Sequence, residues 1–327
     1  MLSRRVFAGS FLVLLPCLFV SVRPRPVCTG FLPPNDLRIP IGIKEAKGIT
    51  RAQFNEVLDR IEAVYGPDIA ARGGTLKINR LWENPTVNAS AERDGDVYIL
   101  NMYGGLARHE AITQDGFALV ACHETGHHIG GAPKIEYHWA SNEGQSDYFA
   151  NLKCLRRIFS DPGSAHFTRM AQPDPVAQQA CAKIYKDAKE QAICLRAATA
   201  GLSVTALFRA LHHEPKEPRF DTPDPAVVET MYDDHPATQC RLDTYFQGSL
   251  CAKPVAEAVD DADPAPGTCT RSQAFAVGLR PLCWYKPPAS EPKDPLGRVA
   301  VAPRVREALS QGAAFSELRN TALWRGR

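Results

Sequence analysis

The stretch FALVACHETGHHIGG, residues 117–131, constrains the fold of this chain more than any other. Its apolar beginning and the two glycines at its end predict a buried helix that stops at the glycines. Residues four positions apart lie on one face of a helix, so His123 and His127 can direct their imidazoles at one metal ion. Glu124 lies beside the first histidine and is a candidate general base. His128 points about 100° away from its neighbour and is expected to pack or to cap.

A third metal ligand is expected in the sequence NEGQSD, where Glu143 begins a predicted helix and Asp147 follows one turn later on the same face. A catalytic zinc takes three protein ligands and keeps one position open for water. We therefore expect one Zn²⁺ per chain, bound by His123, His127 and Glu143. The carboxylate of Asp147 would accept a hydrogen bond from a ligating imidazole. Plainer interpretations stay open, namely a helix-start carboxylate for Glu143 and a solvated residue for Asp147.

This set of residues favours hydrolysis of an amide bond. A bound zinc lowers the pKa of its water towards neutrality and polarises the carbonyl group of the substrate. Glu124 would take the proton of the water and later pass it to the leaving amine. The spacing does not separate peptide bonds of proteins from other amides, such as those of a cell-wall peptide.

The remaining periodicity predicts an α+β fold. Thr50 and Gln53 form a capping box that opens a helix, which Gly66 and Pro67 are expected to end. Two extended runs joined by a charged turn predict a hairpin. The expected sheet is small and antiparallel, with an edge strand beside the helix of the HETGH motif and helices around both. Strands are expected at 75–82, 87–91 and 97–101, and helices at 50–66, 112–131, 143–158, 175–186, 188–212 and 305–318.

The N-terminus indicates export. Arg4 and Arg5 precede an apolar run, which is the layout of a secretory signal peptide. A retained anchor is the alternative, and the proline before Cys17 disfavours lipidation there. We expect a periplasmic or secreted protein. Its expected parts are a signal peptide or anchor at 1–22, a proline-rich lead-in at 23–48, a zinc metallopeptidase domain at 49–252 and a proline-rich, disulfide-containing extension at 253–327.

Charge disfavours several classes of partner. The 327 residues carry a formal net charge of +2, and no cluster of basic residues is dense enough to indicate a nucleic acid or an anionic membrane. Apart from the N-terminal segment, the sequence indicates no membrane partner. The expected partner is a peptide or protein substrate.

Ten cysteines agree with an oxidising compartment, and the C-x₂-C spacing of a metal cluster does not occur in the sequence. Cys122 and Cys154 fall on the two predicted ligand helices. They would form either a disulfide between these helices or two buried free thiols. The simplest pairing of the others joins sequence neighbours: Cys181 with Cys194, Cys240 with Cys251, and Cys269 with Cys283.

Four segments resemble the gluzincin metallopeptidases, and within them the HtpX-like and CAAX-prenyl-protease-like family. They span about residues 45–250. The short connection between His127 and Glu143 is closer to that of thermolysin. The four segments are NASA at 88–91, HETGH at 123–127, EGQSDYFA at 143–150 and HPATQCR at 235–241.

The resemblance implies a zincin-type fold and roles for residues outside the metal set. Asn88, Ala89 and Ala91 would belong to the edge strand along which the substrate backbone lies, although an ordinary edge strand is the plainer interpretation. His235 would stabilise the oxyanion that forms during hydrolysis. Arg241 would support His235 or contact the substrate.

The expected function is that of an exported zinc-dependent metalloendopeptidase. The alternative is an envelope assembly or binding factor without proteolytic activity on the same scaffold. Glu124 argues against the alternative, because binding alone requires no general base.

Overall fold

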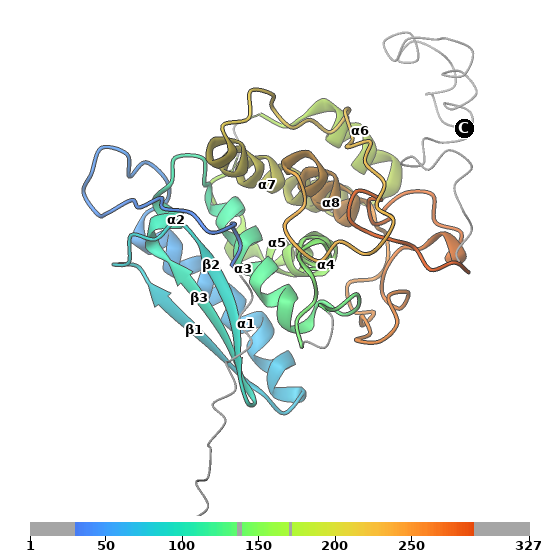
Figure 1. Cartoon of the computed structure of the whole chain (residues 1–327), viewed down its shortest axis with the longest axis horizontal. Coiled ribbons are helices and arrows are strands. Elements are labelled where there is room, and N and C mark those ends of the chain that lie inside the picture. The colour runs from blue at the N-terminus through green and yellow to red at the C-terminus, as the bar shows by residue number, and fades with distance from the viewer. Residues whose placement is uncertain (1–29, 136–138, 170–171, 291–327) are drawn as a thin grey trace, which may run out of the picture.

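The computed structural model describes residues 30–135, 139–169 and 172–290. The predicted signal peptide, Cys17 and the predicted helix 305–318 lie outside these residues. The fold is α+β. Figure 1 shows helix α3 at the centre, with the sheet and helix α1 on one side of it and helices α4, α7 and α8 on the other.

The elements follow the order β1, β2, β3 between helices α1 and α2, with all later elements helical. Most of the expected helices and strands are present with small shifts of their ends. The strands are β1 (Thr75–Leu81), β2 (Ala89–Asp94) and β3 (Val97–Tyr103), and the helices are α1 (Arg51–Ala71), α2 (Gly104–Arg108), α3 (Gln114–Ile129), α4 (Glu143–Phe149), η1 (Ala150–Cys154), α5 (Leu155–Ser160), η2 (Pro162–Ser164), α6 (Pro175–Ile184), α7 (Ala188–His212), α8 (Thr238–Leu250) and η3 (Arg271–Gln273).

The sheet is mixed, so the expectation of an antiparallel sheet is wrong in one pairing. The strand order is β1-β3-β2, with β2 antiparallel and β1 parallel to β3. Leu81 at the end of β1 and Ala89 at the start of β2 lie on either side of the end of β3. The connection 82–88 therefore crosses the end of β3, which leaves β2 at an edge of the sheet.

Helix α1 continues through Pro67, where the sequence predicts its end. The capping box at Thr50 is present, with the Thr50 hydroxyl accepting from the Gln53 amide. On either side of Pro67, Tyr65 and Ile69 maintain the helical spacing of buried apolar residues. Each such side chain contributes about 1.5–3 kcal/mol on burial, which offsets the backbone hydrogen bond that a proline removes.

Helix α3 is buried along its whole length, as its apolar beginning predicts. Thr113 caps it by accepting a hydrogen bond from the Gly116 amide at 3.0 Å. Strands β2 and β3 and helices α1, α4 and α7 all contact it. A central helix of this kind holds its side chains in fixed positions, because neighbours surround it.

The predicted helix 143–158 is present as three consecutive pieces, α4, η1 and α5. Asn142 caps α4 by accepting a hydrogen bond from the Gln145 amide at 2.9 Å. Element η1 is a π-helix, a form that often occurs near functional sites. It begins after Asp147, so Glu143 and Asp147 keep the α-helical spacing that places them on one face.

Helices α7 and α8 pack against each other, with α7 against α3 and α8 against α4 and η1. Within the described part of the chain, α7 is the one helix long and apolar enough to span a membrane. Of its apolar window, 72% is buried inside the protein, as expected of a core helix. Helix α8 has no counterpart among the expected elements.

Two of the predicted disulfides are wrong. Cys240 pairs with Cys283 and Cys251 with Cys269, whereas Cys181–Cys194 and Cys122–Cys154 are formed as expected. Cys240 and Cys251 stand near opposite ends of α8, about 16 Å apart at 1.5 Å per residue. A disulfide needs Cα atoms within about 7 Å, so the two cannot bond.

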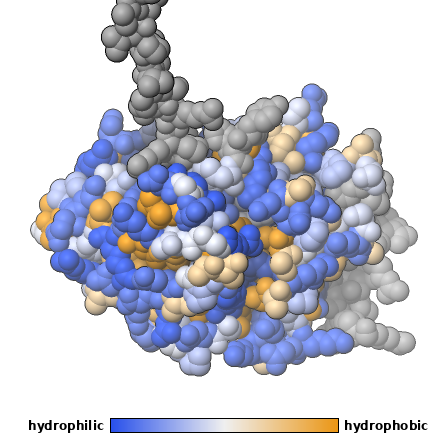
Figure 2. Space-filling model, turned by 90° about the horizontal axis from the view of Figure 1, so that it is seen from below, coloured by the Kyte–Doolittle hydropathy of each residue, from blue (hydrophilic) through white to orange (hydrophobic). Residues whose placement is uncertain are grey.

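The first described residues pack into the main core. Phe31 and Leu32 are fully buried, and Ile39 joins them in the cluster around α3. The stretch 40–48, between Ile39 and the start of α1, is more exposed, and Ile41 is 50% exposed. On the face seen in Figure 2, hydrophilic residues predominate and apolar residues lie among them in small groups.

Candidate metal centre

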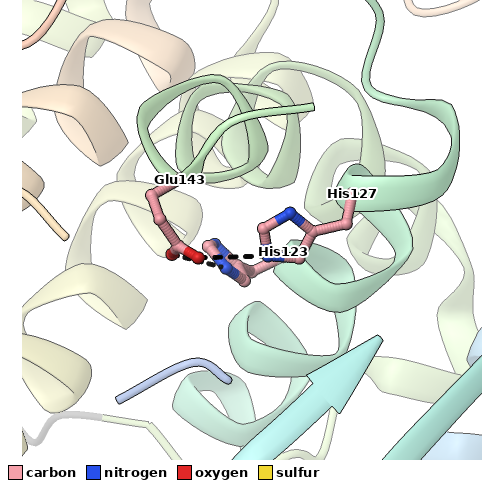
Figure 3. Close-up of side chains that lie close together, drawn as sticks. All are labelled: His123, His127 and Glu143. Carbon is pink, nitrogen blue, oxygen red and sulfur yellow. Dashed lines mark ion pairs between the residues drawn. The ribbon is translucent and has the colours of Figure 1, made fainter. Parts of the chain in front are cut away.

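Three predicted ligands converge between helices α3 and α4. The Nε2 atom of His123 lies 3.3 Å from Glu143 Oε2, and the Nε2 atom of His127 lies 3.5 Å from Glu143 Oε1. One ligand atom from each residue falls within 4.8 Å of the others, and all three side chains are buried. Figure 3 shows both imidazoles from α3 and the carboxylate from α4 pointing toward one another.

The outer nitrogen of each imidazole is bonded to an acceptor. His123 Nδ1 donates to Asp147 Oδ1 at 2.7 Å, and His127 Nδ1 donates to the Ser141 carbonyl at 2.8 Å. These bonds place the proton on Nδ1 and leave Nε2 free to bind metal. Among the described residues, neither Nε2 atom nor Glu143 Oε2 has a hydrogen-bond partner. Buried polar atoms rarely remain without a hydrogen-bond partner, so these two nitrogens and this oxygen fit as ligand atoms of a metal ion.

Asp147 is held by two side chains of α8. Arg241 donates from Nε and Nη2 to the Asp147 carboxylate at 2.8 and 2.7 Å, and Tyr245 donates from its hydroxyl to Oδ1 at 2.9 Å. All three are fully buried. Tyr245 is absent from the predicted site. The i, i+4 spacing of Arg241 and Tyr245 would have indicated one helix face, had a helix been expected there.

Charge at the site favours a cation. Burial lowers the pKa of His123, but Asp147 and Glu143 outweigh it and raise the pKa to about 9. For His127, burial prevails and lowers the pKa to about 4. Burial also raises the pKa of Glu143, but the charges of His127 and His123 hold it well below its usual range. Carboxylates that hold a proton on an imidazole in this way also attract a divalent cation to the same nitrogen.

Glu124 lies beside the cluster as a buried, unpaired carboxyl group. Within the described residues, neither of its oxygens has a hydrogen-bond partner. Burial raises the pKa of Glu124 to about 8. An isolated carboxyl group in such a place costs free energy of folding. A costly titratable group next to a set of metal-ligating atoms is a candidate for a role in catalysis.

His235 and Arg241 also reach the cluster. His235 Nε2 lies 3.7 Å and Arg241 Nη2 lies 3.9 Å from Glu143 Oε2. The carboxylate of Asp234 accepts from His235 Nδ1 at 2.7 Å. The structure thus brings His235 and Arg241 together at Glu143. The adjacent Asp234 is absent from the predicted site.

The predicted substrate residues lie where β2 begins, at the sheet edge beside α3. Ala89 and Ala91 are fully buried, and Ala91 pairs with Leu100 of β3. Ala89 and Asn88 bond to the first described residues of this chain, Phe31 and Leu32.

His128 packs, as the sequence predicts. Its Nε2 donates to the Ile99 carbonyl at 3.1 Å, and its ring stacks on Trp139. A second cluster of metal-ligating side chains, formed by Asp224, Cys240 and Cys283, carries no metal site because its two cysteines form a disulfide. The cluster of His123, His127 and Glu143 is therefore the candidate metal centre of the described residues.

A disulfide ties the two ligand helices together. Cys122 on α3, next to His123, is bonded to Cys154 at the end of η1, with Cα atoms 5.5 Å apart and a sequence separation of 32. The expected disulfide is formed, and the alternative of two free thiols is wrong. The bond fixes the distance between the segments that carry the ligands.

We expect loss of this disulfide to weaken both folding and metal binding. A double Cys122→Ala, Cys154→Ala variant should lose about 3–4 kcal/mol of unfolding free energy, measured by urea denaturation. Its zinc affinity, measured by competition with a chromophoric chelator, should fall. The matched control replaces Cys181 and Cys194, which should cost stability alone. Equal zinc affinity in both variants would show that the Cys122–Cys154 disulfide does not hold the metal-ligating side chains in position.

Comparison with known proteins adds no relative. No protein-family model, no curated protein and no solved structure matches this chain. The fold and the metal centre therefore rest on the residues and contacts described above.

Proposed function

We propose that this chain is a zinc-dependent metalloendopeptidase of the gluzincin type, built on a zincin-type fold. The observation that carries the proposal is the set of unpaired buried atoms on His123, His127 and Glu143, with the unpaired carboxyl of Glu124 beside it. Two imidazoles and one carboxylate form a common ligand set of catalytic zinc sites. A purely structural zinc site is normally closed by a fourth protein ligand and needs no adjacent base.

The proposed roles follow from these positions. His123, His127 and Glu143 would hold a zinc ion, which would supply an activated water molecule and polarise the carbonyl of the substrate. Glu124 would take the proton of that water and deliver it to the leaving nitrogen. His235, 3.7 Å from Glu143, donates to the oxyanion that develops on the carbonyl oxygen. Asp147 orients His123 and is itself held by Arg241.

The proposed location is outside the cytosol, in the periplasm or the medium. The four disulfides of the described residues favour an oxidising compartment. The arginines and apolar run at the start of the sequence favour a signal for export.

Metal removal tests the proposal. The purified protein should contain about one zinc per chain by elemental analysis and should cleave unfolded casein. Dialysis against 1,10-phenanthroline should abolish both the zinc content and the cleavage, and one equivalent of Zn²⁺ should restore them. Stoichiometric zinc without cleavage of casein or any other unfolded protein would instead favour the binding factor.

A further inference from the structure

Residues 30–32 lie beside the start of β2, at the edge of the sheet, with bends at Phe31 and Leu32. The Phe31 amide donates to the Ala89 carbonyl at 2.9 Å. The Leu32 amide donates to Asn88 Oδ1 at 2.9 Å, and Asn88 Nδ2 donates back to the Leu32 carbonyl at 3.1 Å. The bond from Phe31 to Ala89 is of the main-chain kind by which a peptide binds to a sheet edge, and the Asn88 side chain replaces the main chain at Leu32. The chain thus places its own backbone where a peptide substrate of this site is expected.

Two of the three carbonyl groups of the same segment face residues of the candidate centre. His235 Nε2 donates to the Gly30 carbonyl at 2.8 Å, and Arg241 Nη1 donates to the Phe31 carbonyl at 3.1 Å. His235 Nε2 and the second terminal nitrogen of Arg241, Nη2, lie 3.7 and 3.9 Å from Glu143 Oε2. The Gly30–Phe31 peptide bond is therefore held through its carbonyl by His235, which lies beside Glu143, and through its N–H by the Ala89 carbonyl.

The side chains of the segment fit their places closely. The Phe31 ring is fully buried, with ring centroids 4.9 Å from His123 and 5.3 Å from Phe208. The segment at the start of the described chain, blue in Figure 3, passes beside the three metal-ligating side chains. Gly30 has φ +106°, and a Cβ there would come within 2.9 Å of Asn88 Nδ2. Glycine followed by an aromatic residue is thus the pair that the contacts select.

We propose that the chain is its own substrate and that the Gly30–Phe31 bond is cleaved within the same molecule. This inference rests on the proposed function. Water adds its hydroxyl to the Gly30 carbonyl carbon, the C–N bond breaks, and Glu124 transfers the remaining proton to the Phe31 nitrogen. The products are a carboxylate on Gly30 and a new N-terminus at Phe31.

Cleavage also opens the centre to other peptides. His123, Glu124 and His127 are fully buried with the segment in place. Hydrolysis separates Gly30, which His235 holds, from Phe31, so that the Gly30 side can leave while Phe31 stays in the core.

The test uses full-length protein, purified metal-free and then given one equivalent of Zn²⁺. Intact mass and N-terminal sequencing should show conversion to a chain that begins at Phe31, at a fractional rate independent of protein concentration. Gly30→Ala should slow the conversion about 100-fold, because it moves the bond from its donors. Gly42→Ala is the matched control: Gly42 also has positive φ, at +80°, but a Cβ there meets no atom within 4 Å.

A second measurement does not depend on activity. In metal-free protein, hydrogen exchange at the Phe31 and Leu32 amides should be slow, because both are bonded and buried. Gly30→Ala should increase these exchange rates, and Gly42→Ala should leave them unchanged. Fast exchange of both amides in the unsubstituted protein would overturn the proposal, whatever its activity.

The outcomes separate this inference from the proposed function. Casein cleavage with an intact Gly30–Phe31 bond would refute the inference alone. A cut at Phe31 that persists after Glu124→Gln, or whose fractional rate rises with protein concentration, would also refute it. Stoichiometric zinc with cleavage of neither casein nor the chain itself would remove the proposed function and this inference together.

Discussion

Replacement of Glu124 by glutamine should lower the rate of casein cleavage about 10²–10⁴-fold, the usual contribution of a general base. The amide has nearly the shape of the carboxyl group but cannot accept the proton of water. Zinc content should remain near one per chain, because His123, His127 and Glu143 are untouched. The rate is measured on zinc-loaded protein by release of labelled fragments.

The control for this variant is Glu110→Gln. Glu110 forms an exposed ion pair with Lys47, whose side chains are 65% and 58% exposed. Such a pair contributes little to stability, so the control should cleave casein at the wild-type rate. Wild-type cleavage by the Glu124→Gln variant would show that Glu124 is not the base.

Replacement of Arg241 by methionine should cost about 3–5 kcal/mol of unfolding free energy, because it leaves Asp147 as a buried carboxylate without its cation. Burial raises the pKa of Asp147, and the charges of Arg241 and His123 outweigh it and lower the pKa. Arg241→Met removes the larger of these two positive charges from beside Asp147. The measurement is urea unfolding of the metal-free protein with its disulfides intact.

Zinc affinity distinguishes a role at the metal centre from a general effect on folding. Arg196 pairs with Asp115 at 2.7 Å in a similarly buried place away from the metal ligands. Arg196→Met should destabilise the protein and leave zinc affinity unchanged. Arg241→Met should lower zinc affinity about 10–100-fold, the usual effect of losing a partner of a metal ligand. A loss of stability below about 1 kcal/mol in Arg241→Met would contradict this account.

Local signals predict the centre of the fold well. The apolar run before His123 predicts a buried helix, and α3 is buried throughout. The spacing of Glu143 and Asp147 predicts that both lie on one helix face. Glu143 lies against the imidazoles, and Asp147 bonds to His123. These features depend on residues a few positions apart, where helical geometry alone fixes which side chains are neighbours.

Contacts between distant parts of the chain could not be predicted. Arg241 bonds to Asp147 across 94 positions, and His235 bonds to Gly30 across 205. Pairing the cysteines by proximity in sequence failed for Cys240 and Cys251, because the intervening residues form a rigid helix. Such contacts follow from how helices pack, which no local pattern of residues contains.

Helix α8 joins the candidate metal ligands to the end of the described chain. Its residue Arg241 orients Asp147, and its neighbour Cys240 is bonded to Cys283. Beside that cysteine, Trp284 covers Gly144, where a Cβ would come within 2.2 Å of the indole. A chain shortened before this tryptophan would retain every metal ligand but lose the wall behind α4. The segment around Trp284 therefore helps to enclose the candidate centre from more than 130 positions beyond Gly144 in sequence, although it supplies none of the three candidate ligands.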